Sequence, residues 1–278
     1  MNSTQSRHVF LCENDICQTY EQELIGEEPL LIRIEGQPYS VVMRTPGEEI
    51  SHVAGFCLAE GLVDEVEDFA TIGYCEQADS NVVTVTLQPG RRKEVADLLK
   101  RRGFISQTSC GICGKEMIED ICQALTPVID KTRIKISQAV ACVDQLVRYQ
   151  DLYERTRGAH ATILFDSQLD VMAFAEDVGR HNALDKTIGK VFMSGQLAKA
   201  CLVVLSSRIS YELVQKAARA HLPILVSVSR PTALAVELGQ SLNMTLACAG
   251  KESGLLVFCG EERLIVDGKR DADQTLAL

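Results

Sequence analysis

The feature that most restricts the fold of this chain is a regular alternation of short apolar segments and amphipathic segments in its second half. The amphipathic segments have helical periodicity and predict helices that begin near His181, Tyr211 and Thr232. The apolar segments are predicted strands: 160–165 and 171–175 form a hairpin that turns at 166–168, and further strands lie at 200–205, 224–228 and 244–248. Fully apolar strands that alternate with helices predict a largely parallel sheet with helices on both faces.

The first half of the chain has a different pattern. Its predicted elements are a hairpin over 30–34 and 39–43, a helix over 50–58 capped by Gly61, a strand over 83–87 and a basic helix over 91–102. A long helix after Ser137 is expected to bury Val140, Leu146 and Val147. We therefore predict an α/β chain, α+β overall, in three parts. These are a flexible leader over 1–20, a smaller N-terminal mixed α+β domain over 21–130, and a C-terminal three-layer α/β/α domain over 131–278.

Charge and cysteine content narrow the function. The formal charge is 28 − 38 = −10, which argues against a broad basic surface for nucleic acid. The first residues lack the apolar core of a secretory signal, and no run approaches the roughly 18 apolar residues of a membrane helix. We expect a cytoplasmic protein that binds neither membranes nor nucleic acid. In a reducing compartment its 11 cysteines are more readily buried side chains, catalytic thiols or metal ligands than disulfides.

Two cysteines lie in a glycine-rich loop, Thr108-Ser109-Cys110-Gly111-Ile112-Cys113-Gly114-Lys115. A thiolate just before a predicted helix, beside Lys115, is stabilised by exposed N–H groups and positive charge. A structural zinc site would need a second CxxC or a histidine pair, which the sequence lacks. A thioredoxin-type dithiol oxidoreductase would place the pair after a strand, and sulfur transfer would use one thiol as a persulfide carrier. The spacing alone does not separate these last two chemistries.

The other cysteines have less distinctive surroundings. Five fall on predicted apolar faces and are expected to be packing residues: Cys57, Cys122, Cys142, Cys201 and Cys248. Four have no predicted role: Cys12, Cys17, Cys75 and Cys259.

Polar and charged residues recur where the predicted strands of the second half end. The densest group is Ala175-Glu176-Asp177-Val178-Gly179-Arg180-His181-Asn182-Ala183-Leu184-Asp185-Lys186, which we interpret as part of a pocket. Polar turns also follow the next three strands, at 206–210, 227–230 and 249–253. Such strand ends and helix N-termini bind anionic ligands in α/β sheets, so we expect phosphate recognition at this edge. No GxGxxG or P-loop pattern occurs, which argues against an ordinary dinucleotide enzyme or NTPase.

Several of these motifs together resemble those of a known family. Thr45-Pro46, Glu60-Gly61, the loop from Ser109 to Gly114, the segment from Glu176 to Lys186 and Ser206-Ser207-Arg208-Ile209-Ser210-Tyr211-Glu212 together resemble the FdhD family, the sulfur carrier proteins needed for formate dehydrogenase activity. The resemblance implies a sulfurtransferase that takes sulfur from a cysteine desulfurase as a cysteine persulfide. It would deliver this sulfur to the molybdenum or tungsten bis-molybdopterin guanine dinucleotide cofactor used by formate dehydrogenase.

The resemblance also assigns residues. Cys110 matches the persulfide-bearing cysteine and Cys113 its partner, while no metal ligands and no permanently bound cofactor are assigned. The family's cofactor-binding stretch aligns with Ala247, Cys248, Ala249, Gly250, Lys251 and Glu252, and we add the sheet-edge residues His181, Ser206, Ser207 and Arg208. Guanine nucleotides are expected to act as analogues of the cofactor.

Fold and assembly follow from the same resemblance, which implies a cytidine-deaminase-like second domain and a homodimer. Deamination is disfavoured because the sequence lacks the H-x-E and P-C-x-x-C pattern of zinc deaminases. Two alternatives stay open: a dithiol oxidoreductase, and a chaperone that holds the cofactor without catalysis.

Overall fold

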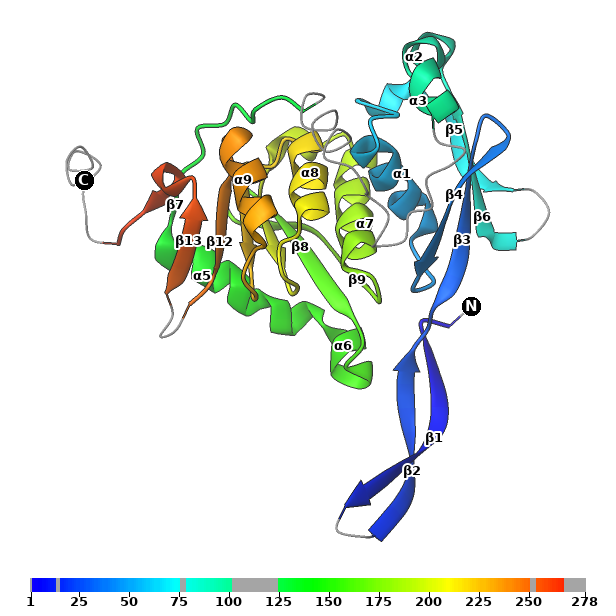
Figure 1. Ribbon diagram of the computed structural model, residues 1–278, viewed down its shortest axis with the longest axis vertical. Coiled ribbons are helices and arrows are strands. Elements are labelled where there is room, and N and C mark those ends of the chain that lie inside the picture. Colours follow the sequence, from blue (N-terminus) through cyan, green and yellow to red (C-terminus); the bar gives the residue numbers. More distant parts are fainter. Residues whose placement is uncertain (1, 14–15, 76–78, 102–124, 251–253, 268–278) are drawn as a thin grey trace.

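The computed structural model describes residues 2–13, 16–75, 79–101, 125–250 and 254–267. Its largest element is a six-stranded sheet with strand order β13-β12-β11-β10-β8-β9 (Figure 1). The strands are β8 (His160–Asp166), β9 (Val171–Asp177), β10 (Ala200–Leu205), β11 (Ile224–Ser227), β12 (Thr245–Ala249) and β13 (Leu255–Cys259). All five strands predicted from the apolar segments are present.

The direction of these strands differs from the prediction. Only the β10–β11 and β11–β12 pairs are parallel, and the β8–β9, β8–β10 and β12–β13 pairs are antiparallel, so the sheet is mixed rather than largely parallel. The β8–β9 pair is the predicted hairpin, and its antiparallel strands are joined by a tight turn. In that turn the Asp166 carboxylate accepts hydrogen bonds from the backbone N–H groups of Gln168 and Asp170.

Helices cover both faces of this sheet, which gives the predicted three layers (Figure 1). Helices α7 (Arg180–Met193), α8 (Tyr211–Arg219) and α9 (Ala233–Ser241) contribute to one hydrophobic cluster, and α5 (Ile136–Asp144) contributes to the other. Successive strand residues alternate between the clusters, as in β8, where Leu164 joins the first and Ile163 and Phe165 join the second. The cytidine-deaminase-like arrangement of these layers stays a prediction.

The helix predicted after Ser137 is shorter than expected. Helix α5 ends at Asp144 and is followed by the 3-10 segment η2 (Gln145–Tyr149) and by α6 (Asp151–Thr156). Val147 is 79% exposed, so its predicted burial is wrong, because the change to 3-10 geometry rotates it away from the face that buries Cys142 and Leu146. Short strands β7 (Ile134–Lys135) and β14 (Leu264–Ile265) pair beside α5, and the 3-10 turns η3 (Leu197–Lys199) and η4 (Glu261–Arg263) precede β10 and β14.

The N-terminal part holds a four-stranded sheet in the order β4-β3-β6-β5. Its elements are β3 (Glu28–Ile34), β4 (Gln37–Arg44), α1 (Glu49–Ala59), η1 (Val66–Asp68), β5 (Phe69–Cys75), β6 (Asp79–Leu87), α2 (Pro89–Glu94) and α3 (Ala96–Arg101). The hairpin, the strand over 83–87 and the first helix are confirmed, with Gly61 in the left-handed conformation at φ +74°. The predicted single helix over 91–102 is instead two helices that meet at the buried Val95.

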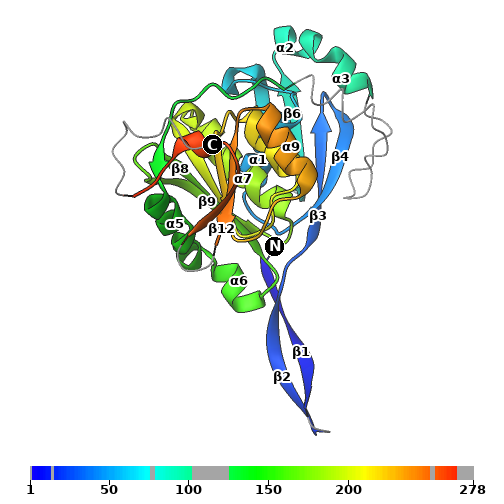
Figure 2. The same ribbon diagram turned by 60° about the vertical axis from the view of Figure 1, so that its left-hand side comes forward.

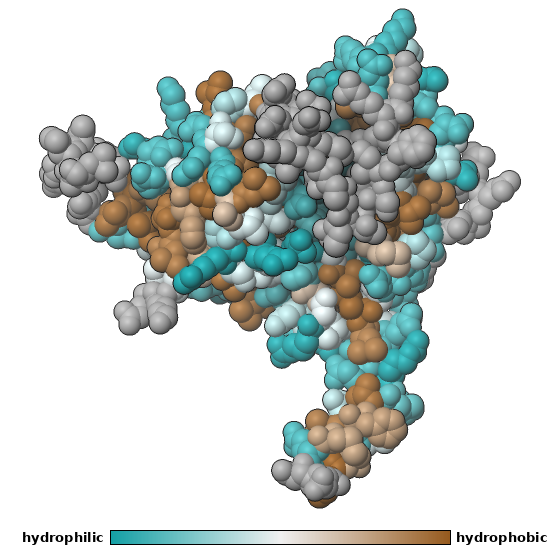
Figure 3. Space-filling view, in the orientation of Figure 1, coloured by the Kyte–Doolittle hydropathy of each residue, from teal (hydrophilic) through white to brown (hydrophobic). Residues whose placement is uncertain are grey.

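Residues 4–13 and 16–25 form two paired antiparallel strands, which we call the arm. Strands β1 (Thr4–Glu13) and β2 (Ile16–Ile25) pair over their whole length, where we had predicted a flexible leader over 1–20. Cys12 and Cys17 face each other across the arm and form a disulfide, contrary to the expectation that disulfides are disfavoured. The arm extends away from the rest of the chain in both ribbon views, and apolar side chains are visible on it (Figures 1, 2 and 3). Its strands pair locally without a core, so hydrophobic burial gave no signal for them.

The two predicted domains share one hydrophobic core. Residues of β3, β6 and α1 belong to the same cluster as residues of α7, α8 and β10. Helices α1 and α7 cross at two glycines: a Cβ at Gly55 would lie 2.0 Å from the Asp185 carbonyl oxygen, and one at Gly189 would lie 1.8 Å from the Ser51 carbonyl oxygen. Only glycine allows backbones to approach this closely. The N-terminal part is therefore packed directly onto the α/β layers.

Candidate functional site

Four strands of the large sheet end at the same edge. Strand β8 is antiparallel to both β9 and β10, so β9 runs in the same direction as β10, β11 and β12. The residues that follow these four strands therefore lie along one edge, as the sequence predicts. Strand β8 begins at that edge with His160, which is paired with Asp177 at the end of β9.

His181 and the start of α8 are joined at this edge. His181 occupies the first turn of α7, and its Nε2 lies 3.3 Å from the Ser210 hydroxyl and 3.7 Å from the Glu212 carboxylate. This interaction with His181 lowers the pKa of Glu212 to about 2. Ser210 is the N-cap residue of α8, so the contact ties the N-termini of α7 and α8 together. The predicted site residue His181 is thus at the edge and held in place.

Arg180, Arg208 and His160 form a group of basic side chains beside His181. Burial and the nearby Arg208 lower the pKa of the Arg180 guanidinium. Burial and the nearby Arg180 also lower the pKa of His160. The Nε atom of Arg180 is buried and has no hydrogen-bond partner among the described residues. We refer to Arg180, Arg208, His160 and His181 as the basic cluster. Neither Arg180 nor His160 is among the predicted site residues, although Arg180 lies in the polar segment 175–186; their position at strand ends was the available signal.

The predicted serines lie at the same edge, but their hydroxyls bond within the chain. The Ser206 hydroxyl accepts a hydrogen bond from the Ala161 backbone N–H at 2.8 Å, which connects β10 to β8. The Ser207 hydroxyl donates to the Arg208 carbonyl oxygen at 3.0 Å. Both hydroxyls therefore shape the turn that positions Arg208.

The stretch predicted to bind the cofactor is only partly described. Ala247 and Cys248 are buried inside β12, whereas Ala249 and Gly250 are partly exposed where the strand ends. The Gly250 N–H donates to the Gly254 carbonyl oxygen at 2.8 Å. Lys251 and Glu252 lie outside the described residues. The role of this stretch stays a prediction.

The segment from Glu176 to Lys186 divides into two groups, rather than lining one pocket as we interpreted it. Asp177 and Lys186 form a buried ion pair at 2.7 Å, and Lys186 also donates to the Thr45 carbonyl oxygen at 2.8 Å. The Asp177 carboxylate accepts from the Thr45 N–H at 3.0 Å, and Asn182 donates to the Met43 carbonyl oxygen at 2.7 Å. Asp177, Asn182 and Lys186 therefore anchor the turn after β4, whereas Arg180 and His181 are at the sheet edge.

The cysteines that can be located fall into two kinds. Cys12 and Cys17 are bonded to each other, and the other cysteines whose side chains the structure describes are free and buried: Cys57, Cys142, Cys201, Cys248 and Cys259. Burial raises the pKa of Cys142 to about 11 and that of Cys201 to about 12, and also raises the pKa of the other three thiols. The predicted packing role is confirmed for Cys57, Cys142, Cys201 and Cys248. Cys110, Cys113 and Cys122 lie outside the described residues, so the predicted thiol loop stays a prediction.

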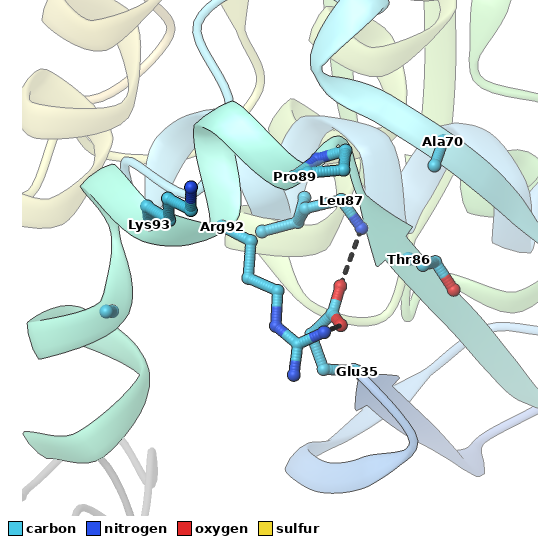
Figure 4. A pocket seen from close by; sticks show the side chains of 8 residues that line it. Glu35, Ala70, Thr86, Leu87, Pro89, Arg92 and Lys93 are labelled. Carbon is cyan, nitrogen blue, oxygen red and sulfur yellow. Dashed lines mark hydrogen bonds and ion pairs between the residues drawn. The ribbon is translucent and has the colours of Figure 1, made fainter.

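A separate hollow of about 600 Å³ lies on the N-terminal part, between β5, β6 and α2 (Figure 4). At its wall the Glu35 carboxylate accepts from the Leu87 N–H at 2.8 Å and pairs with Arg92 at 2.9 Å. None of the predicted site residues lines it. Within the described part of the chain, no cluster of His, Cys, Asp or Glu is arranged to hold a metal ion, and no helix is long and apolar enough to cross a membrane.

Comparison with known proteins identifies the family of this chain. The model of the FdhD/NarQ family matches residues 25–265, which include the whole six-stranded sheet and the α1–α7 contact. The chain belongs to the FdhD/NarQ family. Its relatives include the sulfur carrier protein FdhD of Streptomyces avermitilis, 35% identical with 94% of this chain and 95% of the relative covered. The sulfur carrier protein FdhD of Mycobacterium tuberculosis is 37% identical, with 94% and 99% covered.

The fold is also found in a solved structure. A crystal structure of a putative formate dehydrogenase accessory protein from Desulfotalea psychrophila superposes with a TM-score of 0.75, at 21% identity, and covers 95% of this chain and all of that one. At this identity the similarity supports the fold alone. The mixed α/β architecture of this FdhD/NarQ family member is therefore shared with that protein.

Proposed function

We propose that this chain is a sulfur carrier that supports formate dehydrogenase by delivering sulfur to its metal–pterin cofactor. The observation that carries the proposal is membership in the FdhD/NarQ family along nearly the whole chain, with relatives at 35–37% identity that are sulfur carrier proteins. The CxxC pair in a glycine-rich loop supplies the chemistry that such a carrier needs.

Cys110 is the proposed site of the persulfide. Thiolates are the nucleophiles in sulfur exchange, and the five buried thiols with raised pKa values are poor candidates. The Cys110 thiolate attacks the outer sulfur of a persulfide on a cysteine desulfurase. One S–S bond breaks and one forms, and the donor cysteine leaves as a thiolate, so the step needs no added oxidant or reductant.

Cys113 is proposed to assist release. Its thiolate attacks the Cys110 sulfur, sulfide leaves, and a Cys110–Cys113 disulfide forms. A dithiol reductant must then reduce this disulfide before the next cycle.

The proposed acceptor is the molybdenum or tungsten bis-molybdopterin guanine dinucleotide cofactor, bound as a substrate at the sheet edge. Its phosphates and guanines carry negative charge and hydrogen-bonding groups, which suit the donors near His181, Arg208 and Gly250. The chain has a net charge of −10, so local donors rather than overall charge must attract this anion. A homodimer and docking to formate dehydrogenase complete the proposed assembly.

Persulfide loading tests the proposal directly. The purified chain is incubated with a cysteine desulfurase and cysteine, and intact mass is recorded before and after cyanide treatment. We expect a cyanide-labile gain of one sulfur atom on the wild type and on the Cys12→Ser/Cys17→Ser control, which removes two exposed cysteines. The gain should be absent from Cys110→Ala, and a gain that survives this substitution contradicts the assignment.

The same variants separate the alternatives. Formate dehydrogenase activity that Cys110→Ala still restores would favour a cofactor chaperone. Reduction of a model disulfide at a rate close to that of thioredoxin would favour a dithiol oxidoreductase.

A further inference from the structure

The arm carries the one disulfide that the structure describes, and this disulfide is exposed. Cys12 on β1 and Cys17 on β2 lie opposite each other in the strand register and are bonded through their sulfur atoms. Both residues are exposed, whereas the other cysteines whose side chains the structure describes are buried. Thiol–disulfide exchange needs a thiolate to reach a sulfur atom. Within the described part of the chain, Cys12 and Cys17 are therefore the cysteines open to exchange.

The polar contacts that hold the arm to the rest of the protein are near its base. The Gln22 side-chain amide donates to the Arg155 carbonyl oxygen at 3.1 Å. The Arg155 guanidinium pairs with Glu23 at 2.5 Å and donates to the Thr4 hydroxyl at 3.1 Å. We call residues 8–13 and 16–21 the outer half of the arm. Among the described residues, no hydrogen bond or ion pair joins this outer half to a residue outside the arm.

The disulfide decides whether the outer half is ordered. Two strands without a third strand or a core are marginally stable in water, and the described part of β1 and β2 pairs with no other strand. The disulfide joins the strands one residue pair before their last pair, Glu13 and Ile16, and prevents them from separating there. A disulfide stabilises mainly by restricting the unfolded chain. Reduction removes this restriction, so the outer half frays while the base stays attached through Arg155.

The order of the outer half also determines an apolar face. Val9 lies opposite Tyr20 in the strand register. Leu11 and Ile16 follow at even spacings along the same two strands, so the four side chains share one face. Leu11, Ile16 and Tyr20 are 46%, 63% and 44% exposed, and apolar side chains are visible on the arm (Figure 3). Paired strands gather these side chains on one surface, whereas frayed strands disperse them.

A dithiol is the reductant that fits this geometry. When a single thiolate attacks one arm sulfur, the S–S bond breaks, a mixed disulfide forms and the other arm cysteine leaves as a thiolate. The strand register holds that thiolate opposite the mixed disulfide, so it re-forms the arm disulfide and expels the attacking thiol. The second thiolate of a dithiol competes with this reversal, because it attacks the mixed disulfide from within the donor and frees the arm cysteine.

We propose that Cys12 and Cys17 form a thiol–disulfide exchange site for a protein dithiol, and that reduction of this site releases the outer half of the arm. Two electrons and two protons pass to the arm, which ends with two thiols, and the donor ends as a disulfide. The exchange involves neither a persulfide nor Cys110, so the inference goes beyond the proposed function and does not rest on it.

Differential alkylation tests the exchange. The full-length protein, isolated without added thiols, is incubated with thioredoxin, thioredoxin reductase and NADPH, or with glutathione at the same thiol concentration, and is then alkylated with iodoacetamide. The tryptic peptide from His8 to Arg33 contains both arm cysteines and no other cysteine. We expect no alkylation of this peptide before reduction and two alkylated cysteines after thioredoxin. Reduction by glutathione should be at least about tenfold slower.

Amide hydrogen exchange tests the release of the outer half. We expect its peptides to exchange at least about tenfold faster in the reduced protein than in the oxidised protein, with peptides from β10 unchanged. Cys12→Ser/Cys17→Ser is the matched control, and it should exchange like the reduced wild type whether or not thioredoxin is present. Its Tm should equal that of the oxidised wild type, because the described residues of the arm belong to neither hydrophobic cluster.

Several results would overturn the inference. Alkylation of both arm cysteines before any reductant is added would show that no disulfide forms. A disulfide that thioredoxin leaves intact, or that glutathione reduces equally fast, would exclude a dithiol exchange site. Equal hydrogen exchange in the two redox states would exclude release of the outer half. Failure of persulfide loading at Cys110 would affect the proposed function alone, because none of these measurements involves that residue.

Discussion

The contact between α1 and α7 should not tolerate a methyl group. In Gly189→Ala the new Cβ would lie 1.8 Å from the Ser51 carbonyl oxygen, and Cβ contacts below 3.0 Å essentially do not occur. The two helices must therefore separate by at least 3.0 − 1.8 = 1.2 Å at this point. A gap of about 1 Å forfeits up to about half of the dispersion energy of the contacts across it.

The expected magnitude combines two opposing effects. Overpacking of a tight interior typically destabilises by about 1–3 kcal/mol, and this site belongs at the upper end because backbone atoms, not flexible side chains, oppose the methyl group. Alanine recovers up to about 1 kcal/mol because glycine is a poorer helix former. We expect the free energy of unfolding to fall by about 2 kcal/mol or slightly more, which lowers Tm by about 4–8 °C.

Urea and thermal unfolding followed by circular dichroism measure this change, with Gly90→Ala in α2 as the control. A Cβ at Gly90 meets no atom within 4 Å, so this substitution adds helix propensity alone and should leave Tm unchanged or higher. The reasoning is refuted if Gly189→Ala unfolds at the wild-type temperature, or if Gly90→Ala is equally destabilised.

Three further predictions concern buried charge and buried thiols. Lys186→Met leaves the Asp177 carboxylate buried without its partner at 2.7 Å, and should lower the free energy of unfolding by about 3–5 kcal/mol in urea titrations. The double variant with Asp177→Asn should be more stable than Lys186→Met, and the opposite order would contradict an ion-pair role. Burial and the nearby Lys186 hold the pKa of His52 well below 6.5, so below this pH the unfolded chain takes up a proton that the folded chain does not. As the pH is lowered below 6.5, the free energy of unfolding should therefore fall more steeply in the wild type than in His52→Gln, by about 1.4 kcal/mol per pH unit. Parallel pH profiles of the two proteins would exclude this contribution. Iodoacetamide at pH 8 should leave the five buried thiols unmodified until urea is added: Cys57, Cys142, Cys201, Cys248 and Cys259. Peptide mass mapping checks this, and rapid alkylation of any of these thiols in the folded protein would disprove its burial.

Local sequence patterns were sufficient where hydrophobic burial is strong. The predicted strand over 200–205 matches β10 at both ends because all six side chains are buried, and a short apolar run between helices has few other uses. The arm was missed for the converse reason. Most of its residues are exposed, and its strands are stabilised by pairing with each other, which leaves no periodic pattern of burial in the sequence.

The candidate site shows the same division. The CxxC loop and the polar strand ends are visible in the sequence because their chemistry is carried by neighbouring residues. The roles of residues 177–186 are not visible in the sequence, because Asp177 and Lys186 contact Thr45, which lies more than 130 positions away in the chain. The predicted single pocket therefore combined residues that contact the turn after β4, such as Asp177 and Lys186, with His181, which contacts the start of α8.

The sequence by itself determined the family, the layered α/β class and the thiol pair proposed to carry sulfur. Only the tertiary structure decided which cations share the sheet edge. Inserting β8 between β9 and β10 brings His160 to the edge that also carries Arg180 and Arg208. Strand order depends on long-range pairing, and no local pattern in the chain specifies it.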